Sequence, residues 1–153
     1  MKEEKNDVYF MKIAVNEAKK ALTKGEVPIG CVVVKNKKII AQTHNLKETT
    51  KNPLMHAELF CILKAAKKLG NWRLCDVIMY TTMEPCLMCF GAIYEARISK
   101  LVYGISNTRN ETRKIIKHAK YNHQLIIKKG ILNMEIEKLM KRFFNQIRVN
   151  DKE

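Results

Sequence analysis

Two short motifs bring together residue types that bind a transition metal. The first is His56-Ala57-Glu58, and the second is Pro85-Cys86-Leu87-Met88-Cys89. One imidazole and two thiolates suit Zn²⁺. Three protein ligands leave a fourth coordination position open, which is typical of a catalytic rather than a structural zinc. The sequence therefore predicts a zinc centre formed by His56, Cys86 and Cys89.

The second motif is expected at the start of a helix. Cys86 and Cys89 are three positions apart, so they lie on one helix face and can bind one ion together. Pro85 suits a position just before or at a helix start, where a missing N–H costs nothing. Both sulfurs would then lie at a helix N-terminus, whose partial positive charge favours the thiolate form.

The first motif also requires a helix start. His56 and Glu58 would point about 200° apart in the middle of a helix. They share a site only if a helix begins near His56, and Asn52-Pro53 forms a suitable turn before it. Glu58 is then a carboxylate beside the metal that can carry protons. Because Zn²⁺ lowers the pKa of its water to roughly 7, hydroxide is available as a nucleophile at neutral pH.

The remaining cysteines and histidines leave other interpretations open. A structural zinc would need a fourth protein ligand, such as Cys75 or His44. A disulfide between Cys86 and Cys89 is disfavoured, because five cysteines without a secretory signal indicate a reducing compartment. Three cysteines in apolar stretches are expected to be buried small hydrophobic side chains: Cys31, Cys61 and Cys75.

Helices and strands alternate around the motifs and predict a layered α/β domain. Apolar positions at helical spacing predict helices over 9–24, from His56 onward, from Cys86 onward and over 136–147. Apolar, β-branched runs predict a hairpin of 29–34 and 38–43, and strands over 76–82, 100–104 and 124–128. No repeat or long linker interrupts the chain, so residues 1–153 are expected to form a single domain with its core at about 9–148.

Composition agrees with a basic, globular protein. The 153 residues, 46% of them hydrophobic, can bury roughly 68–70% of their unfolded surface. No apolar stretch approaches the 18 or so residues of a membrane span, so we expect a soluble, intracellular protein. The net charge of +14 favours a polyanionic partner such as nucleic acid. The alternative is a solvated lysine surface that reflects genome base composition.

The residues around both motifs resemble a known family over about residues 9–148. The pattern H-x-E…P-C-x-x-C is shared by zinc-dependent nucleobase deaminases, including cytidine and guanine deaminases. The further segments resemble the TadA-type tRNA adenosine deaminases within the cytidine-deaminase-like superfamily. These segments are Glu26-Val27-Pro28-Ile29-Gly30, Asn45, Asn71-Trp72-Arg73-Leu74, Met83-Glu84, Gly91-Ala92, Arg97-Ile98, Asn122-His123, Gly130-Ile131-Leu132, Phe143-Phe144 and Arg148.

This resemblance implies a three-layer α/β/α fold with a central mixed sheet and one Zn²⁺ per subunit. It also implies a homodimer, located in the cytoplasm or in an organellar matrix. The implied reaction is hydrolytic deamination of adenosine to inosine at the wobble position of a tRNA anticodon. In that reaction Glu58 takes the proton of the nucleophile that attacks C6 of the purine and delivers it to N1.

The resemblance also assigns contacts with the substrate. An Asn at the end of the second strand holds the target nucleotide in this family, although Asn45 taken alone is an ordinary turn residue. Aromatic stacking and phosphate contacts hold single-stranded RNA, although Phe143 and Phe144 taken alone are most simply core residues. The substrate and RNA-binding residues implied are Asn45, Val27, Ala57, Lys47, Arg73, Asn107, Phe144 and Arg148.

One position departs from the family pattern. Asn107 stands after Tyr103-Gly104 where the family usually has Asp, which keeps the shape of the side chain but removes its charge. The stretch 104–122 is also shorter than usual. The preference for RNA over DNA depends on the sugar contact, so this difference leaves that preference open.

Two other functions share some of these features. A guanine or cytosine/cytidine deaminase acting on a free base or nucleoside needs the same zinc site but no basic groove. A non-catalytic, zinc-bearing RNA-binding subunit needs the groove but no proton carrier. The presence of Glu58 argues against the second alternative.

Overall fold

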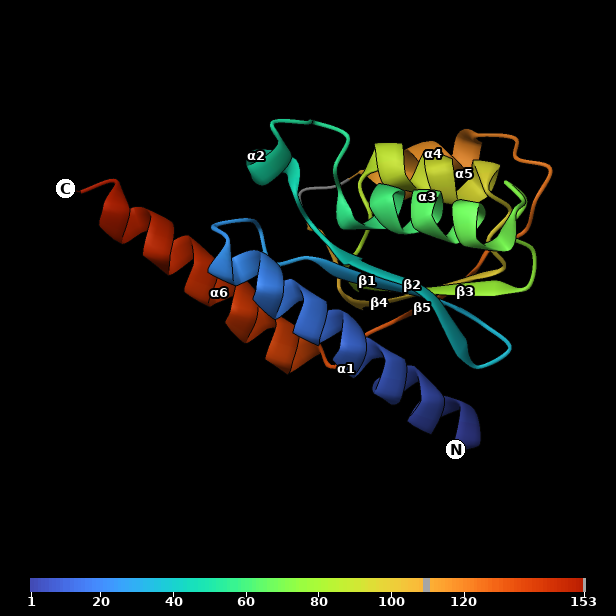
Figure 1. Ribbon diagram of the computed structural model, residues 1–153, viewed down its shortest axis with the longest axis horizontal. Coiled ribbons are helices and arrows are strands. Elements are labelled where there is room, and N and C mark those ends of the chain that lie inside the picture. Colours follow the sequence, from blue (N-terminus) through green and yellow to red (C-terminus); the bar gives the residue numbers. More distant parts are fainter. Residues whose placement is uncertain (109–110, 153) are drawn as a thin grey trace.

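The computed structural model describes residues 1–108 and 111–152. A five-stranded sheet with the order β2-β1-β3-β4-β5 lies between two layers of helices (Figure 1). Helices α1 and α6 cover one face of the sheet, and α3, α4 and α5 cover the other. This confirms the three-layer α/β/α fold. The strands are β1 (Gly30–Lys35), β2 (Lys38–His44), β3 (Val77–Met83), β4 (Lys100–Ile105) and β5 (Ile126–Lys129). The helices are α1 (Lys2–Thr23), α2 (Lys47–Thr50), α3 (Ala57–Leu69), α4 (Leu87–Glu95), α5 (Thr112–His118) and α6 (Asn133–Asn150).

The sheet is mixed, as expected. Strand β1 pairs antiparallel with β2 and β3, whereas β3, β4 and β5 run parallel. The turn of the β1–β2 hairpin uses Asn36 and Lys37, both with positive φ, which matches the right-handed twist of the strands. The parallel pair β3–β4 is joined by a crossover that carries α4.

Successive side chains along the strands point to opposite sides, so both faces of the sheet are apolar. In β1, Cys31 and Val33 pack toward α3 and α4, whereas Val32 and Val34 pack toward α1 and α6. Because successive side chains of a strand point to opposite faces, one apolar run builds both layers of core.

Gly30 allows α1 to lie close against the start of β1. A Cβ at this position would collide with the backbone of Ala14 and Ala18. A larger residue would push α1 away from the edge of the sheet where β1 begins and β2 ends.

The structure differs from the sequence expectation in three elements. Helix α1 begins at Lys2 rather than at Tyr9, and the short helices α2 and α5 were not expected. The first turns of α1 lack apolar periodicity and are held by buried Asp7 instead. This carboxylate accepts hydrogen bonds from the Tyr80 hydroxyl at 2.9 Å and from Lys128 Nζ at 2.7 Å.

None of the described helices combines the length and the apolar character needed to cross a membrane.

Candidate active site and metal centre

The two metal-binding motifs lie at one edge of the sheet. Gly30 pairs with His44 at the start of β1 and the end of β2, and Met83 pairs with Ile105 at the ends of β3 and β4. The segments that leave this edge therefore carry Asn45 and Pro85-Cys86. The motifs meet because the strand ends bring them together.

Each motif places a metal ligand at the N-cap of a helix, the residue just before its first turn. His56 is the N-cap of α3, with extended φ and ψ of −72° and 147°. Cys86 is the N-cap of α4, at −71° and 172°, and Cys89 lies in the first turn. Extended backbone is the usual N-cap conformation. The predicted helix starts are thus confirmed, and two positive helix ends converge on the ligands.

The three ligand atoms are spaced for one zinc ion. His56 Nδ1 lies 3.6 Å from Cys86 Sγ and 3.5 Å from Cys89 Sγ. Zn–S distances of about 2.3 Å and Zn–N distances of about 2.0–2.1 Å give an N···S separation of about 3.6 Å at a tetrahedral angle. Both N···S separations therefore fit one Zn²⁺ ion.

Glu58 lies beside the ligands in a buried position. It occupies the first turn of α3 with 3% of its surface exposed, and its Oε2 lies 3.7 Å from Cys89 Sγ. Burial raises the pKa of this carboxyl to about 6. A carboxyl with a pKa near neutrality can both accept and return a proton, which suits general acid–base catalysis.

The two thiols differ in acidity. The hydrogen bond from Cys89 lowers the pKa of Cys86 to about 4, with a contribution from His56 and against the effect of burial. The same hydrogen bond and burial raise the pKa of Cys89. The interaction with Cys86 in turn raises the pKa of His56. Cys86 is thus a thiolate at neutral pH, and metal binding requires release of the Cys89 proton.

The alternative of a fourth protein ligand is not supported. Among residues 1–108 and 111–152, the group of His, Cys, Asp and Glu side chains close enough to hold one ion is His56, Cys86 and Cys89. His44 Nδ1 lies 2.8 Å from Glu17 Oε2. The expectation that Cys75 is buried was wrong: it is exposed in the turn before β3, while Cys31 and Cys61 are buried.

Asn45 lies directly after β2 at the same edge. It is 5% exposed, and its Oδ1 has no hydrogen-bond partner among the described residues. Its backbone N–H donates to Ile29 O at 3.0 Å, and the next N–H, of Leu46, donates to Met55 O at 3.0 Å. These bonds join the strand end to the residue before His56. A buried acceptor there is available for a ligand.

Three further predicted residues surround this edge. Val27 is half-buried between α1 and β1. Ala57 is fully buried, and its carbonyl accepts a hydrogen bond from Thr43 Oγ1 at 2.7 Å, which ties β2 to the start of α3. The backbone N–H of Asn107, beyond β4, donates to Glu84 Oε2 at 3.0 Å.

The predicted RNA-binding residues are exposed and lie on separate elements. Lys47 is on α2, and the guanidinium of Arg73 lies 4.2 Å from the centroid of the Trp72 ring. Arg148 is exposed on α6, and Phe144 is 46% exposed. Phe143 is buried at 7%, so the core interpretation holds for the first phenylalanine only.

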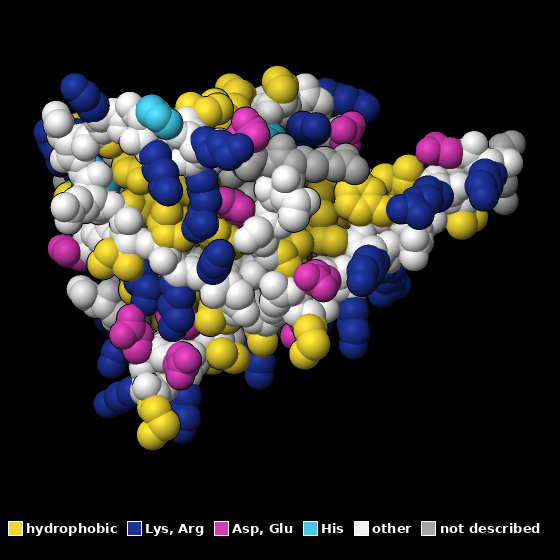
Figure 2. All heavy atoms as spheres, turned by 180° about the vertical axis from the view of Figure 1, so that it is seen from behind, with side chains coloured by type: hydrophobic (Ala, Val, Ile, Leu, Met, Phe, Trp, Pro, Cys, Tyr) yellow, Lys and Arg dark blue, Asp and Glu magenta, His cyan; other side chains and the backbone are white. Residues whose placement is uncertain are grey.

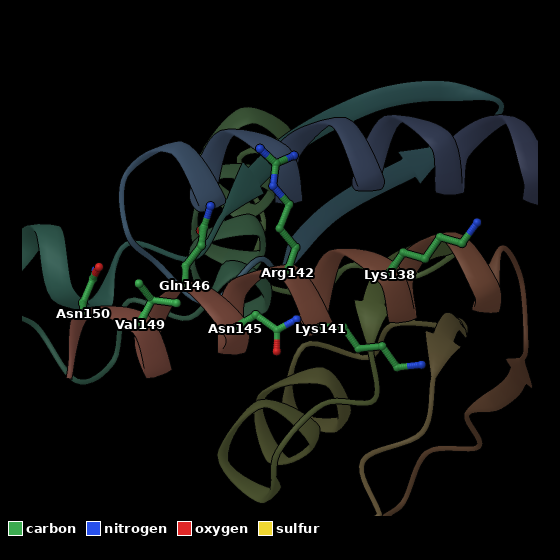
Figure 3. A pocket seen from close by; sticks show the side chains of 7 residues that line it. All are labelled: Lys138, Lys141, Arg142, Asn145, Gln146, Val149 and Asn150. Carbon is green, nitrogen blue, oxygen red and sulfur yellow. The ribbon is translucent and has the colours of Figure 1, made fainter. Parts of the chain in front are cut away.

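The outer side of helix α6 is basic. A hollow of about 760 Å³ is lined by cations, amides and one apolar residue (Figure 3). The C-terminal end of α6 projects beyond the sheet, with Lys and Arg side chains along it (Figures 1 and 2). The lining residues are Lys138, Lys141, Arg142, Asn145, Gln146, Val149 and Asn150.

Sequence reasoning missed two buried carboxylates beside the motifs. Glu84 accepts from the Asn107 backbone at 3.0 Å and lies 3.2 Å from Arg113 Nε. Glu26 has no exposed surface and contacts Asn45. Each is an acidic residue inside an otherwise apolar segment, and that is the signal that could have identified them.

The chain is similar to known deaminases. Residues 4–105 match the family described as the cytidine and deoxycytidylate deaminase zinc-binding region. The tRNA-specific adenosine deaminase of Streptococcus pyogenes serotype M18 is 41% identical over 148 residues, which cover 94% of this chain and 93% of that protein.

Two solved structures are also similar. One, from a study of A-to-I editing by tRNA:A34 deaminases at the wobble position of transfer RNA, has a TM-score of 0.80 at 32% identity. It covers 86% of this chain and 98% of its own. The guanine deaminase of Bacillus subtilis has a TM-score of 0.63 at 40% identity, covering 71% of this chain and 68% of its own.

Proposed function

The chain belongs to the cytidine and deoxycytidylate deaminase family, among its tRNA-specific adenosine deaminases, and we propose that it deaminates adenosine to inosine at the wobble position of a tRNA anticodon. The observation that carries this proposal is the likeness to tRNA-specific adenosine deaminases over nearly the whole chain, including α6. The open metal centre with a buried proton carrier supports the same reaction.

We assign the zinc of this family to His56, Cys86 and Cys89. Their atoms are close enough to bind one ion, and their chemistry is that of a three-ligand catalytic centre. When bound, zinc supplies an activated water for attack on an electrophilic carbon. The N-termini of α3 and α4 keep the ligands fixed, because both helices start at the ligand residues.

Glu58 moves the protons of the reaction. Its carboxylate accepts a proton from the attacking water and delivers it to N1 of the purine, so that C6 becomes tetrahedral. A further proton transfer through Glu58 converts the amino group into a leaving ammonia. Burial beside Cys89 suits this cycle, since the carboxyl titrates near neutrality and is shielded from bulk water.

The remaining assigned residues hold the nucleotide and its RNA. We assign Asn45, Val27, Ala57 and Asn107, which lie near the strand ends beside the metal-binding motifs, to contacts with the target nucleotide. An adenosine already in a loop can enter the site at modest unstacking cost. The exposed residues contact the flanking RNA by charge and stacking: Lys47, Arg73, Phe144 and Arg148.

We further propose a homodimer that works in the cytoplasm. The layer of α3 and α4 exposes Leu63, Leu87 and Met88 at 63%, 45% and 37%. Exposed apolar side chains on helices beside the metal ligands suit a subunit interface. A second copy of the chain would cover them and complete the RNA groove.

A free-base guanine deaminase is the second candidate, because a solved guanine deaminase is similar in sequence and fold. That likeness covers a smaller share of both chains and has a lower TM-score than the likeness to the tRNA:A34 deaminase structure. The tRNA substrate is therefore favoured.

The test is incubation of the zinc-loaded protein with an anticodon stem-loop that has adenosine at the wobble position, followed by nucleoside analysis. Inosine should form from the stem-loop, with no turnover of free guanine, cytosine or cytidine. Turnover of a free base alone would replace the tRNA assignment. Stem-loop binding without inosine would indicate a non-catalytic subunit.

A further inference from the structure

A buried carboxylate, that of Glu26, contacts two parts of the nucleoside site at once. Its Oε2 lies 3.4 Å from Asn45 Nδ2, and its Oε1 accepts a hydrogen bond from the backbone N–H of Thr49 at 2.6 Å. Glu26 has no exposed surface. Thr49 belongs to α2, the helix that also carries Lys47.

The chemistry of Glu26 fixes which way the Asn45 amide points. The oxygens of a carboxylate only accept hydrogen bonds, so Asn45 must turn its NH₂ group toward Glu26. Its Oδ1 then faces away from Glu26, and this atom is buried without a partner among the described residues. An unmet buried acceptor costs free energy, which a donor on a ligand would recover.

The position of Asn45, next to the segment that carries His56, suits a nucleoside as that ligand. Asn45 is held by its backbone bond to Ile29, and Leu46 is bonded to Met55, the residue before His56. The backbone at Asn45 is therefore tied to the segment that enters the metal centre, and only the orientation of its side chain is left to be set.

We propose that Glu26 is a positioning residue that makes Asn45 a hydrogen-bond acceptor toward the substrate. The group bound by Asn45 Oδ1 is a donor, either a hydroxyl of the target ribose or an N–H of its base. Glu26 also anchors α2 through Thr49, so one carboxylate holds both the Asn45 side chain and the helix that carries Lys47. This inference rests on the proposed function.

The decisive variant is Glu26→Gln. The backbone N–H of Thr49 can only donate, so it keeps the Gln oxygen and leaves the Gln NH₂ facing Asn45. The Asn45 amide must then rotate and present its own NH₂ to the substrate. We expect kcat/KM to fall roughly 10- to 100-fold, mainly through KM, with zinc content and Tm close to those of the wild type.

The exchange Glu26→Gln with Asn45→Asp should restore activity. Asp at position 45 accepts from the Gln NH₂ with one oxygen and presents the other to the substrate, and the pair still carries one carboxylate. Recovery to within roughly fivefold of the wild type is expected. Asn45→Asp alone, which sets two carboxylates against each other, should be impaired. Glu17→Gln is the matched control, because Glu17 is buried at the same edge but contacts His44, and it should change kcat/KM less than about twofold.

A stem-loop with a single 2′-deoxyadenosine at the target position distinguishes the two donors. Loss of the Glu26→Gln penalty on this substrate supports the 2′-hydroxyl, and an unchanged penalty supports another donor of the same nucleoside. Stem-loop affinity is measured in parallel with zinc-loaded proteins that carry Glu58→Ala.

The outcomes separate the two proposals. No inosine from the wild type, with the same ranking of affinities, overturns the proposed reaction but supports the role of Glu26. Inosine from the wild type, with the double exchange no better than Glu26→Gln alone, overturns the role of Glu26 and leaves the reaction standing.

Discussion

The metal centre and the exposed surface of α6 differ in how their side chains are fixed. At the metal centre, buried Glu58 and the ligands sit at two helix starts, and donor atoms lie 3.5–3.6 Å apart. On α6, Phe144 is 46% exposed and Arg148 is exposed. The function of the metal centre depends on each ligand atom and on the Glu58 carboxylate, so single substitutions should abolish it. The surface of α6 acts through summed charge and contact area, so single substitutions should only weaken binding.

The largest effect is expected from loss of a ligand. Cys86→Ala should reduce zinc from about one ion per chain to a small fraction, and inosine formation should become undetectable. Elemental analysis and the stem-loop assay measure the two quantities. Cys75→Ala is the matched control, because this cysteine is exposed away from the site and should keep full zinc. Full zinc in Cys86→Ala would remove Cys86 from the ligand set.

The next effect separates metal binding from proton transfer. Glu58→Ala should keep zinc and bind the stem-loop, yet lose roughly 10²- to 10⁴-fold in single-turnover rate, because a general acid–base group is removed. Glu58→Gln, which keeps the size of the side chain, should behave similarly. Glu95→Ala, an exposed glutamate at the end of α4, serves as the control. A near-normal rate in Glu58→Ala would assign the proton transfers elsewhere.

Substitutions on the exposed surface should have smaller, salt-dependent effects. Arg148→Ala and Arg73→Ala should each weaken stem-loop binding severalfold at low salt, with unchanged zinc. Each should flatten the slope of log K against log salt by roughly 0.7, as expected for one lost phosphate contact on a single strand. Lys38→Ala removes an exposed lysine at the far end of β2 and should leave the slope nearly unchanged. Equal salt slopes for the three variants would show that the overall positive charge binds the stem-loop, without specific phosphate contacts from Arg73 or Arg148.

The smallest effect concerns the buried carboxylate that supports the end of β2. Burial raises the pKa of Glu17, but hydrogen bonds from Lys20 and His44 outweigh it and hold the pKa below the usual value of a glutamate. A lowered folded-state pKa gives stability that is present above the unfolded pKa and lost as pH falls through the folded pKa. Glu17→Gln should therefore cost about 1 kcal/mol at neutral pH, and the difference in unfolding free energy should vanish at acidic pH. Denaturant titrations at several pH values measure this.

The control for Glu17 is a pair of exposed charges. Glu111→Gln breaks the Lys114–Glu111 pair, in which both side chains are more than 70% exposed, and should change stability little at any pH. If Glu17→Gln lowers the free energy of unfolding by the same amount at every pH, the effect of Glu17 comes from packing rather than from its charge.

Local signals determined most of the metal centre. His56-Ala57-Glu58 predicted a helix start, because only there can the side chains of His56 and Glu58 reach one site. Pro85-Cys86 predicted a second start, because proline suits the beginning of a helix. Both starts were confirmed. The ligand types, the proton carrier and the main strands followed from residue chemistry and alternation in the same way. The short helices α2 and α5 did not, since four and seven residues carry too little periodicity to be recognised.

Only the tertiary structure decided how these parts combine. The sequence could not separate Phe143, which is buried, from Phe144, which is exposed, because both lie at helical spacing from the apolar position Met140. It could not show that Cys75 lies in an exposed turn. Nor could it show which way the amide of Asn45 points, because its partner Glu26 lies on the loop between α1 and β1, distant in the sequence. These features depend on contacts between distant segments, and such contacts form only when the sheet brings the strand ends to one edge.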